Sequence, residues 1–295
     1  MPATHVIPLA RETLHGHFST DLAPVVTVDP GDSVSFRALA AFWHWDAGGR
    51  WLDDLHPVLD DGHPLTGPIA VRGARAGGTL ELRIDVVRPR DWGMTFAGES
   101  ALEWRLDGST GVTADGAQSV ALAPFLGVIG MPPPAPGVHS TTPPRRFGGN
   151  IDCKELTAGA TLLLPIGVDG ALLSAGDGHA AQGDGEVSGT AIECPLDEVR
   201  LTLALRPDLE LRMPIARTDS AWIAFGFDHD LDLAADMALE TMLDLMQREH
   251  GLDRRRALAL ASVCVDLRVT QIVNDAKGVH AVLRHDALAA PRPVS

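Results

Sequence analysis

The sequence predicts a β-rich α+β protein whose helices are gathered near the C-terminus. The chain of 295 residues holds 30 glycines and 21 prolines, about one residue in six, against about 12 % in average proteins. Aromatic residues make up only 5 % and tyrosine is absent, a balance that fits short strands joined by turns better than a helical bundle. Apolar residues alternate with period two in the first half, and recur at helical spacing only late in the chain.

The N-terminal part is predicted to form strands. Residues 25–28 (VVTV) lead into a turn at 29–32 (DPGD), and 33–36 (SVSF) then alternate as a half-buried strand does. Residues 42–68 differ, because three tryptophans, three histidines and five acids occur there without a period. We expect a long ordered loop, a class that is often functional.

Residues 131–149 are the best candidate for a linker, because six prolines lie between 130 and 149. The predicted division is therefore a β-rich part at 1–130, this Pro-rich linker, and a part at 150–295 that carries further strands and the helices. A single integrated domain is the alternative.

The C-terminal part is predicted to run from strands into helices. Strands are expected between 161 and 205, and apolar residues from 233 onward then follow helical spacing up to Gly251. Aspartates at 228, 230 and 232 precede this helix, and we interpret them as N-caps, because Leu233 stands where a calcium loop needs glycine. A second helix is expected after Asp253 and a strand at 263–269.

Charge and cysteine content exclude several function classes. The formal charge of −15 argues against sequence-independent binding of nucleic acid, which needs clustered lysine and arginine. No apolar run reaches the roughly 18–20 residues of a membrane-spanning helix, and the first residues lack the pattern of a signal peptide. Three cysteines without a paired spacing form no disulfide framework. We expect a cytoplasmic protein without nucleic-acid or membrane partners.

The stretch 177–193 is the most informative for chemistry. It contains four carboxylates, His179 and four glycines, with no lysine or arginine. Carboxylate and imidazole ligands suit a divalent cation such as Zn²⁺, or a general acid/base pair. Clustered like charges also raise a carboxyl pKa or require a cation. The alternative is an acidic, glycine-rich surface hairpin.

A second candidate lies at 150–154, where Asn150, Asp152 and Lys154 alternate. In an extended conformation these three side chains would share one face. An aspartate beside a lysine could orient an amide or activate water, and the alternative is an ordinary surface ion pair. The neighbouring Cys153 is a weaker candidate nucleophile, because adjacent residues of a strand face opposite ways and so cannot form a triad.

Three stretches carry a family resemblance. Residues 148–159 (GGNIDCKELTAG), 176–186 (GDGHAAQGDGE) and 189–193 (GTAIE) together resemble the acetamidase/formamidase family, and shorter matches at 14–15, 29–32 and 67–74 follow the same order. The resemblance implies a sandwich-like β core and hydrolysis of small amides, formamide- or acetamide-like or somewhat larger, to ammonia and a carboxylate. It also implies a bound metal, a cytoplasmic location and a homo-oligomer.

The resemblance further implies roles for individual residues around one site. Asp177 and His179 are expected to bind the metal, zinc with calcium as the alternative, and His15 or Asp152 would complete the ligand set. Glu193 is the candidate general base, and Lys154 would stabilise an oxyanion. The remaining expected site residues are Asp152 and Glu186 for catalysis, and Asn150, Gln182 and Asp184 for substrate binding.

One departure from the family pattern opens an alternative function. Many relatives have an aspartate where this chain has Ala40. If that aspartate contacts metal or substrate, the chain could be a non-catalytic amide- or metal-binding protein on the same fold. A purely structural oligomerisation domain is a third possibility. Likewise, Trp43, Trp45 and Trp51 could wall a substrate pocket or simply fill core.

Overall fold

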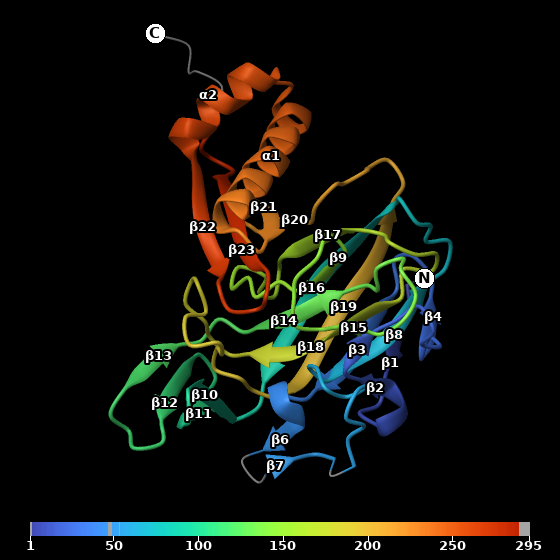
Figure 1. Cartoon of the computed structure of the whole chain (residues 1–295), viewed down its shortest axis with the longest axis vertical. Helices are drawn as coiled ribbons and strands as arrows, with labels where there is room; N and C mark the ends of the chain where they lie inside the picture. The colour runs from blue at the N-terminus through green and yellow to red at the C-terminus, as the bar shows by residue number, and fades with distance from the viewer. Residues whose placement is uncertain (1, 47–48, 53, 289–295) are drawn as a thin grey trace.

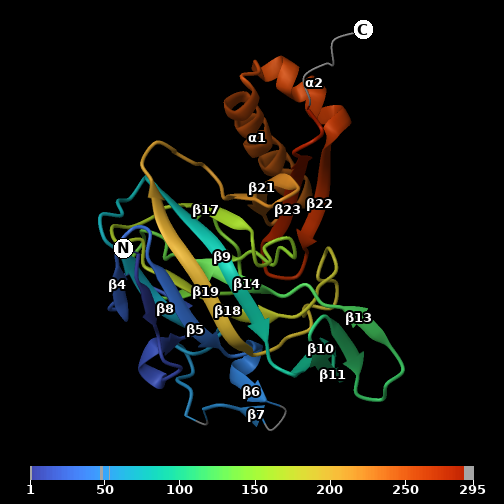
Figure 2. The same cartoon turned by 180° about the vertical axis from the view of Figure 1, so that it is seen from behind.

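Two large β-sheets pack face to face in the computed structural model, which describes residues 2–46, 49–52 and 54–288 (Figures 1 and 2). Apart from the parallel pair β1–β5, the neighbours in the first sheet are antiparallel. In spatial order its nine strands are β1 (Thr4–Val6), β5 (Ser33–Ala38), β19 (Leu196–Arg206), β9 (Thr79–Pro89), β17 (Thr161–Pro165), β20 (Ile215–Arg217), β21 (Ala221–Asp228), β23 (Lys277–Arg284) and β22 (Val265–Gln271).

The second sheet has six strands and carries much of the candidate site. Apolar side chains of both sheets form one buried core, with Leu82 and Leu201 from the first sheet and Ile69 and Leu126 from the second. This arrangement confirms the β-rich, sandwich-like prediction. The strands are β16 (Gly148–Asn150), β14 (Phe125–Gly130), β18 (Leu173–His179), β8 (Leu65–Val71) and β2 (Leu14–His15), with β4 (Val26–Val28) parallel to β8.

The predicted linker does not separate two domains. Strands from before and after it alternate in both large sheets, as in the order β5–β19–β9–β17. Within the segment, β15 (His139–Ser140) pairs with β3 (His17–Phe18), and the side chain of Thr141 is buried. The prolines at 131–149 thus shape a packed connection, and the strand order matches the alternative of one integrated domain.

The C-terminal helices form a separate layer at one end of the molecule (Figure 1). Helix α1 (Leu231–His250) begins at Asp230, whose side chain accepts hydrogen bonds from two backbone amides, and ends at Gly251 in the left-handed conformation. Helix α2 (Arg254–Cys264) begins at the cap Asp253. Both helices, and the capping role of Asp230, were predicted. In the described part of the chain, neither helix combines the length and apolar composition needed to cross a membrane.

Smaller elements decorate the sandwich. A four-stranded antiparallel unit projects from its side (Figure 2). The segment predicted as a long loop contains a 3-10 turn and a short hairpin, and there Trp43 is buried against Leu14 and Leu39. The elements are β10 (Trp92–Ala97), β11 (Ser100–Asp107), β12 (Thr110–Thr113) and β13 (Ser119–Ala121) in the projecting unit, β6 (His44–Asp46) and β7 (Gly49–Arg50) in the hairpin, and the 3-10 turns η1 (Arg11–Thr13) and η2 (Ala41–Trp43).

The turn before β5 carries a carboxylate that stabilises the fold in a pH-dependent way. Asp32 accepts hydrogen bonds from the Ala3 amide at 2.7 Å and the His5 ring at 2.8 Å, and these contacts lower its pKa to about 2. Since the unfolded pKa is about 3.9, this contribution is present above pH 4 and is lost as the pH falls towards 2.

We therefore expect Asp32→Asn to lower the free energy of unfolding at neutral pH, with the difference from the parent shrinking between pH 4 and pH 2. Urea unfolding at several pH values measures this. Asp29→Asn is the matched control, because Asp29 lies in the same turn and makes an exposed ion pair with Arg72. A difference for Asp32→Asn that stays constant over this range would contradict the prediction.

Candidate functional site

Backbone pairing brings the end of β18 together with the segment around Glu193. Glu193 forms an isolated bridge with His179 on one side and with Met94 of β10 on the other. The Cys194 amide donates to the Gly178 carbonyl at 2.7 Å, and the Ala180 amide donates to that of Ile192 at 2.9 Å. His179 and Glu193, which are 14 positions apart in the sequence, are therefore neighbours on two paired strands.

Strand β14 supplies the other side of the site. Its register with β18 pairs Leu126 with Gly178 and Val128 with Gly176, so that Gly127 lies opposite Asp177. The Gly127 carbonyl accepts from the amides of Ile151 and Asp152. Asp152 has φ of 53°, outside the extended region. The prediction of an extended run from Asn150 to Lys154 is thus wrong, because the chain turns at Asp152 and sends its carboxylate inward.

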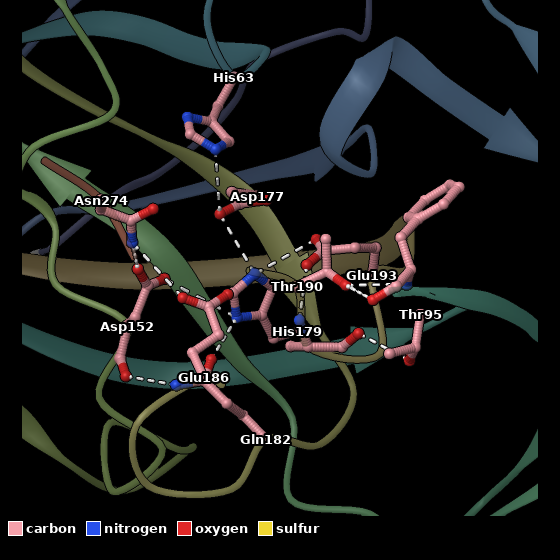
Figure 3. Close-up of polar contacts among 12 residues, drawn as sticks. His63, Thr95, Asp152, Asp177, His179, Gln182, Glu186, Thr190, Glu193 and Asn274 are labelled. Carbon is pink, nitrogen blue, oxygen red and sulfur yellow. Dashed lines mark hydrogen bonds and ion pairs between the residues drawn. The ribbon is translucent and has the colours of Figure 1, made fainter. Parts of the chain in front are cut away.

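Two further segments close the site. The Gly185 amide donates to the carbonyl of Thr270 in β22, which fastens the loop that carries Glu186. At the end of β22, the Gln271 side-chain carbonyl accepts from the backbone amide of Asn274 at 3.1 Å. The Asn274 side chain then donates to the carboxylates of Asp152 and Glu186. Figure 3 shows these side chains approaching the His179 ring.

The imidazole of His179 is at the centre of the cluster. Its Nδ1 lies 3.0 Å from the side-chain oxygen of Gln182, and Gln182 donates its amide hydrogen to the Asp152 backbone carbonyl at 2.8 Å. With Gln182 oriented in this way, its oxygen accepts, and Nδ1 of His179 must carry a proton.

The other ring nitrogen then faces two acids. Nε2 lies 3.2 Å from Asp177 Oδ2 and 3.2 Å from Glu193 Oε2. If Nε2 carries no proton, its lone pair repels the two carboxylate oxygens. A cation, either a proton or a metal ion, is therefore needed between Nε2 and these oxygens.

Burial and charge set the protonation states in the cluster. Burial by itself lowers the pKa of His179, but the charges of Glu193 and Asp177 outweigh it and raise that pKa well above 6.5. Burial raises the pKa of Asp177, yet the charges of His179 and His63 reverse this and the net shift is downward.

Three carboxyl groups shift the opposite way. Burial, reinforced by repulsion from Glu186, raises the pKa of Asp152 well above its usual value. Burial also raises the pKa of Glu193, and it raises that of Glu186 to about 7. The cluster thus contains more carboxyl groups than one histidine can balance when they are ionised.

These residues fit a divalent cation. Within the described residues, two overlapping groups place one ligand atom each within 4.8 Å of one another: Asp177, His179 and Glu193, and Asp152, His179 and Glu186. Three carboxylate oxygens in these groups are buried without a hydrogen-bond partner among the described residues, one each on Asp152, Asp177 and Glu193. Buried oxygens of this kind are costly unless a cation or hydrogen bond satisfies them, and a His/carboxylate set suits Zn²⁺.

The structure brings some of the predicted site residues together and leaves others outside. His15 is in neither metal group, because its Nδ1 contacts the His17 carbonyl at 2.6 Å and its Nε2 contacts the Ser174 hydroxyl at 3.0 Å. Lys154 and Asp184 form an ion pair at 2.9 Å, and both side chains are about one-third exposed. Lys154 was predicted to stabilise an oxyanion, but the chain turn at Asp152 directs it to this pair.

Asn150, a predicted substrate-binding residue, is buried in β16, and its side-chain oxygen has no hydrogen-bond partner among the described residues. Gln182, also predicted to bind substrate, instead bridges His179 and Asp152. Cys153 is fully buried, and burial raises the pKa of its thiol. A thiol that stays protonated is a poor nucleophile, so Cys153 remains the weaker candidate.

Three residues in contact with the cluster were missed from the sequence. Gly127 lies against the carboxylates, and Asn274 binds two of them. His63 points its Nε2 at Asp177 Oδ2 from 4.0 Å and is oriented by the Thr141 hydroxyl at 2.9 Å. The unusual composition of the stretch at 42–68, rich in histidine and tryptophan, could have pointed to His63. The sequence around Gly127 and Asn274 has no feature that indicates a site.

Two cavities adjoin the cluster. One of about 520 Å³ is lined by His63 and Asn274 together with Trp43, His56 and Asp60. The other, of about 390 Å³, is mostly apolar, with Trp104 and Ile192 beside Gln182 and Glu186. Trp43 thus both fills core and lines a cavity. The polar cluster is therefore flanked by space in which a small molecule could lie.

Comparison with known proteins supplies independent information. The model of the Acetamidase/Formamidase family matches residues 134–283. An acetamidase from Mycolicibacterium smegmatis is 52 % identical over 48 residues, and a formamidase from Methylophilus methylotrophus is 50 % identical over 48 residues. Each alignment spans 16 % of this chain and only 12 % of the curated relative's own length.

Solved structures match over nearly the whole chain. An acetamidase from Bacillus halodurans superposes with a TM-score of 0.83 at 30 % identity, covering 94 % of this chain and 97 % of that one. An acetamidase from Yersinia enterocolitica has a TM-score of 0.86 at 24 % identity, covering 98 % of this chain and 94 % of that one, which shows a shared fold.

Proposed function

Because the chain belongs to the acetamidase/formamidase family, we propose that it hydrolyses small linear amides to ammonia and a carboxylate with the help of a divalent metal ion, zinc in the first place. The observation that carries this proposal is the surroundings of His179, with Nδ1 committed to Gln182 and Nε2 between the oxygens of Asp177 and Glu193. A bound ion would polarise the amide carbonyl and lower the pKa of a water molecule.

The residues divide into those that hold the ion and those that handle the substrate. Asp177, His179 and Glu193 would hold the ion, so Glu193 takes the role of a ligand in place of the general base expected from the sequence. Gln182 fixes the ring of His179 in the ligating tautomer. Glu186 belongs to the cluster and also lines the apolar cavity. It is therefore the group we assign to take a proton from water and deliver it to the departing amine.

The cavities support substrates of modest size. The 390 Å³ space begins at Glu186 and is walled by Trp104 and Ile192, so it offers an apolar surface to the acyl side of an amide. A carboxamide group would then lie towards Glu186 and Gln182. Formamide, acetamide and somewhat larger aliphatic amides fit this arrangement.

Purified protein is expected to release ammonia from at least one of formamide, acetamide and propionamide. Dialysis against a chelator should abolish the release, and Zn²⁺ should restore it. Absence of ammonia from every amide in the presence of saturating Zn²⁺ would contradict hydrolysis. In that case tight amide binding would favour the non-catalytic alternative, which is motivated by Ala40, a buried residue two positions beyond the end of β5.

The setting of this activity is part of the same proposal. The three cysteines are all free, which supports a reducing, cytoplasmic environment. We also propose that the chain forms a homo-oligomer, as its membership of the family suggests. Light scattering of the purified protein would give the number of subunits.

A further inference from the structure

A second group of potential ligands lies outside the cluster described above. Cys153, Glu155 and His280 each offer one donor atom, and the three atoms lie within 4.8 Å of one another. Cys153 and Glu155 follow β16, and His280 lies in the middle of β23. The group shares no residue with the His179 cluster, and it contains a sulfur donor, which that cluster lacks.

The geometry of the three donor atoms is convergent. The Cys153 thiol lies 3.2 Å from Glu155 Oε2, and His280 Nε2 lies 3.5 Å from the same oxygen. The other oxygen of this carboxylate accepts from Arg268 at 3.0 Å. Arg268 thereby fixes the orientation of Glu155 and leaves Oε2 facing the thiol and the imidazole.

An unpartnered nitrogen points into this space. His280 is fully buried, and its Nε2 has no hydrogen-bond partner among the described residues. Its Nδ1 lies 2.8 Å from the Thr270 hydroxyl. Metal-bound histidines in proteins commonly use one ring nitrogen for the ion and the other for a hydrogen bond of this kind. A buried ring nitrogen without a partner is costly unless a ligand satisfies it.

We propose that Cys153 Sγ, Glu155 Oε2 and His280 Nε2 form a second metal site, selective for a borderline-soft divalent ion of the Zn²⁺ class. A thiolate and an imidazole favour such an ion over Ca²⁺ or Mg²⁺, which prefer oxygen ligands. On binding, the sulfur–hydrogen bond of Cys153 breaks, its proton leaves to solvent, and a sulfur–metal bond forms without any change of oxidation state. Three protein ligands leave the fourth tetrahedral position to water.

The side of this site nearest to solvent is that of Glu155. Cys153 and His280 are buried, but the Glu155 side chain is 19 % exposed, and the neighbouring pair Lys154–Asp184 is about one-third exposed. An ion would therefore enter from the Glu155 side. The three donor atoms already lie within 4.8 Å of one another, so Lys154 does not need to move for the site to form.

Cobalt(II) titration of the metal-free protein tests the proposal, because a thiolate bound to Co²⁺ gives a charge-transfer absorption in the near ultraviolet, and oxygen and nitrogen ligands do not. We expect this band in the parent protein. We expect its loss in Cys153→Ser and its retention in Cys194→Ser, a matched control at another fully buried cysteine. Because the readout requires sulfur, it is independent of amide hydrolysis and of the His179 cluster.

A second variant covers the case in which Cys153→Ser fails to fold. Glu155→Gln keeps the size of a partly exposed side chain and removes only its charge, and we expect it to weaken Co²⁺ binding about tenfold or more. No band in the parent at saturating Co²⁺ would overturn the proposal, as would a band of parental strength in Cys153→Ser or unchanged affinity in Glu155→Gln.

Discussion

Substitution of His179 by alanine is expected to remove the metal ion of the His179 cluster and to reduce ammonia release by about three orders of magnitude or more. His179 is the only residue that offers a nitrogen donor in either of the two overlapping groups found among the described residues. Without it, buried carboxylates remain that repel one another. Elemental analysis of the purified variant and an ammonia assay on the best amide measure the two effects.

The control for this substitution is His17→Ala. His17 is also buried, and it hydrogen-bonds to the Leu59 carbonyl at 2.8 Å. The His17→Ala variant should retain the metal, provided that circular dichroism shows the parental fold. Full metal content together with parental ammonia release in His179→Ala would refute the assignment of the site.

Gly127→Ala is expected to reduce activity about a hundredfold or more without adding any charge. A Cβ at this position would lie 2.4 Å from Asp177 Oδ2 and 2.8 Å from both Asp152 Oδ1 and His179 Cε1. The side chains around the ion must therefore move, and displacements of about 1 Å in a reacting site cost about 10²-fold in rate. Overpacking should also lower the free energy of unfolding by about 1–3 kcal/mol.

Gly183→Ala is the matched glycine control. A Cβ there has no heavy atom within 4 Å, although Gly183 lies in the neighbouring loop and lines the apolar cavity. Amide kinetics and urea unfolding of both variants separate the effects on rate and on stability. Parental kinetics in Gly127→Ala would show that the ligand geometry tolerates a shift, and would argue against the proposed arrangement.

Elements whose signals are local could be predicted from the sequence. Helix α1 (Leu231–His250) starts two residues before the expected position 233 and ends at Gly251 as expected. Its ends could be predicted this closely because a capping carboxylate and a left-handed glycine act within a few residues of the helix end. The strand that begins at Ser33 was likewise evident from its alternation. The proline-rich segment at 131–149 was predicted to be a linker, but it is part of the packed sandwich. Composition does not reveal that β15 pairs with β3, which is more than 100 residues away.

The candidate site was predicted only where its residues are close in sequence. Asp177, His179, Glu186 and Glu193 stood out because four acids and a histidine occur within 17 residues without a basic residue. Lys154 was expected to point into the site together with Asp152. The left-handed backbone at Asp152 instead turns the chain, so that the two side chains point in different directions. Alternation can be used to assign faces only while the chain is extended, and three of the cluster's acids, Asp152, Asp177 and Glu186, have positive φ.

By itself, then, the sequence determined the β-rich class, the two C-terminal helices, the family and the acidic stretch that supplies most of the ligands. The tertiary structure alone decided which side chains meet. It brought Gly127, His63 and Asn274 to the cluster, left His15 outside it, and joined Cys153 and Glu155 to His280. The physical reason is that helix caps and strand periods are short-range, whereas a site in a β-sandwich depends on the register between strands far apart in the chain.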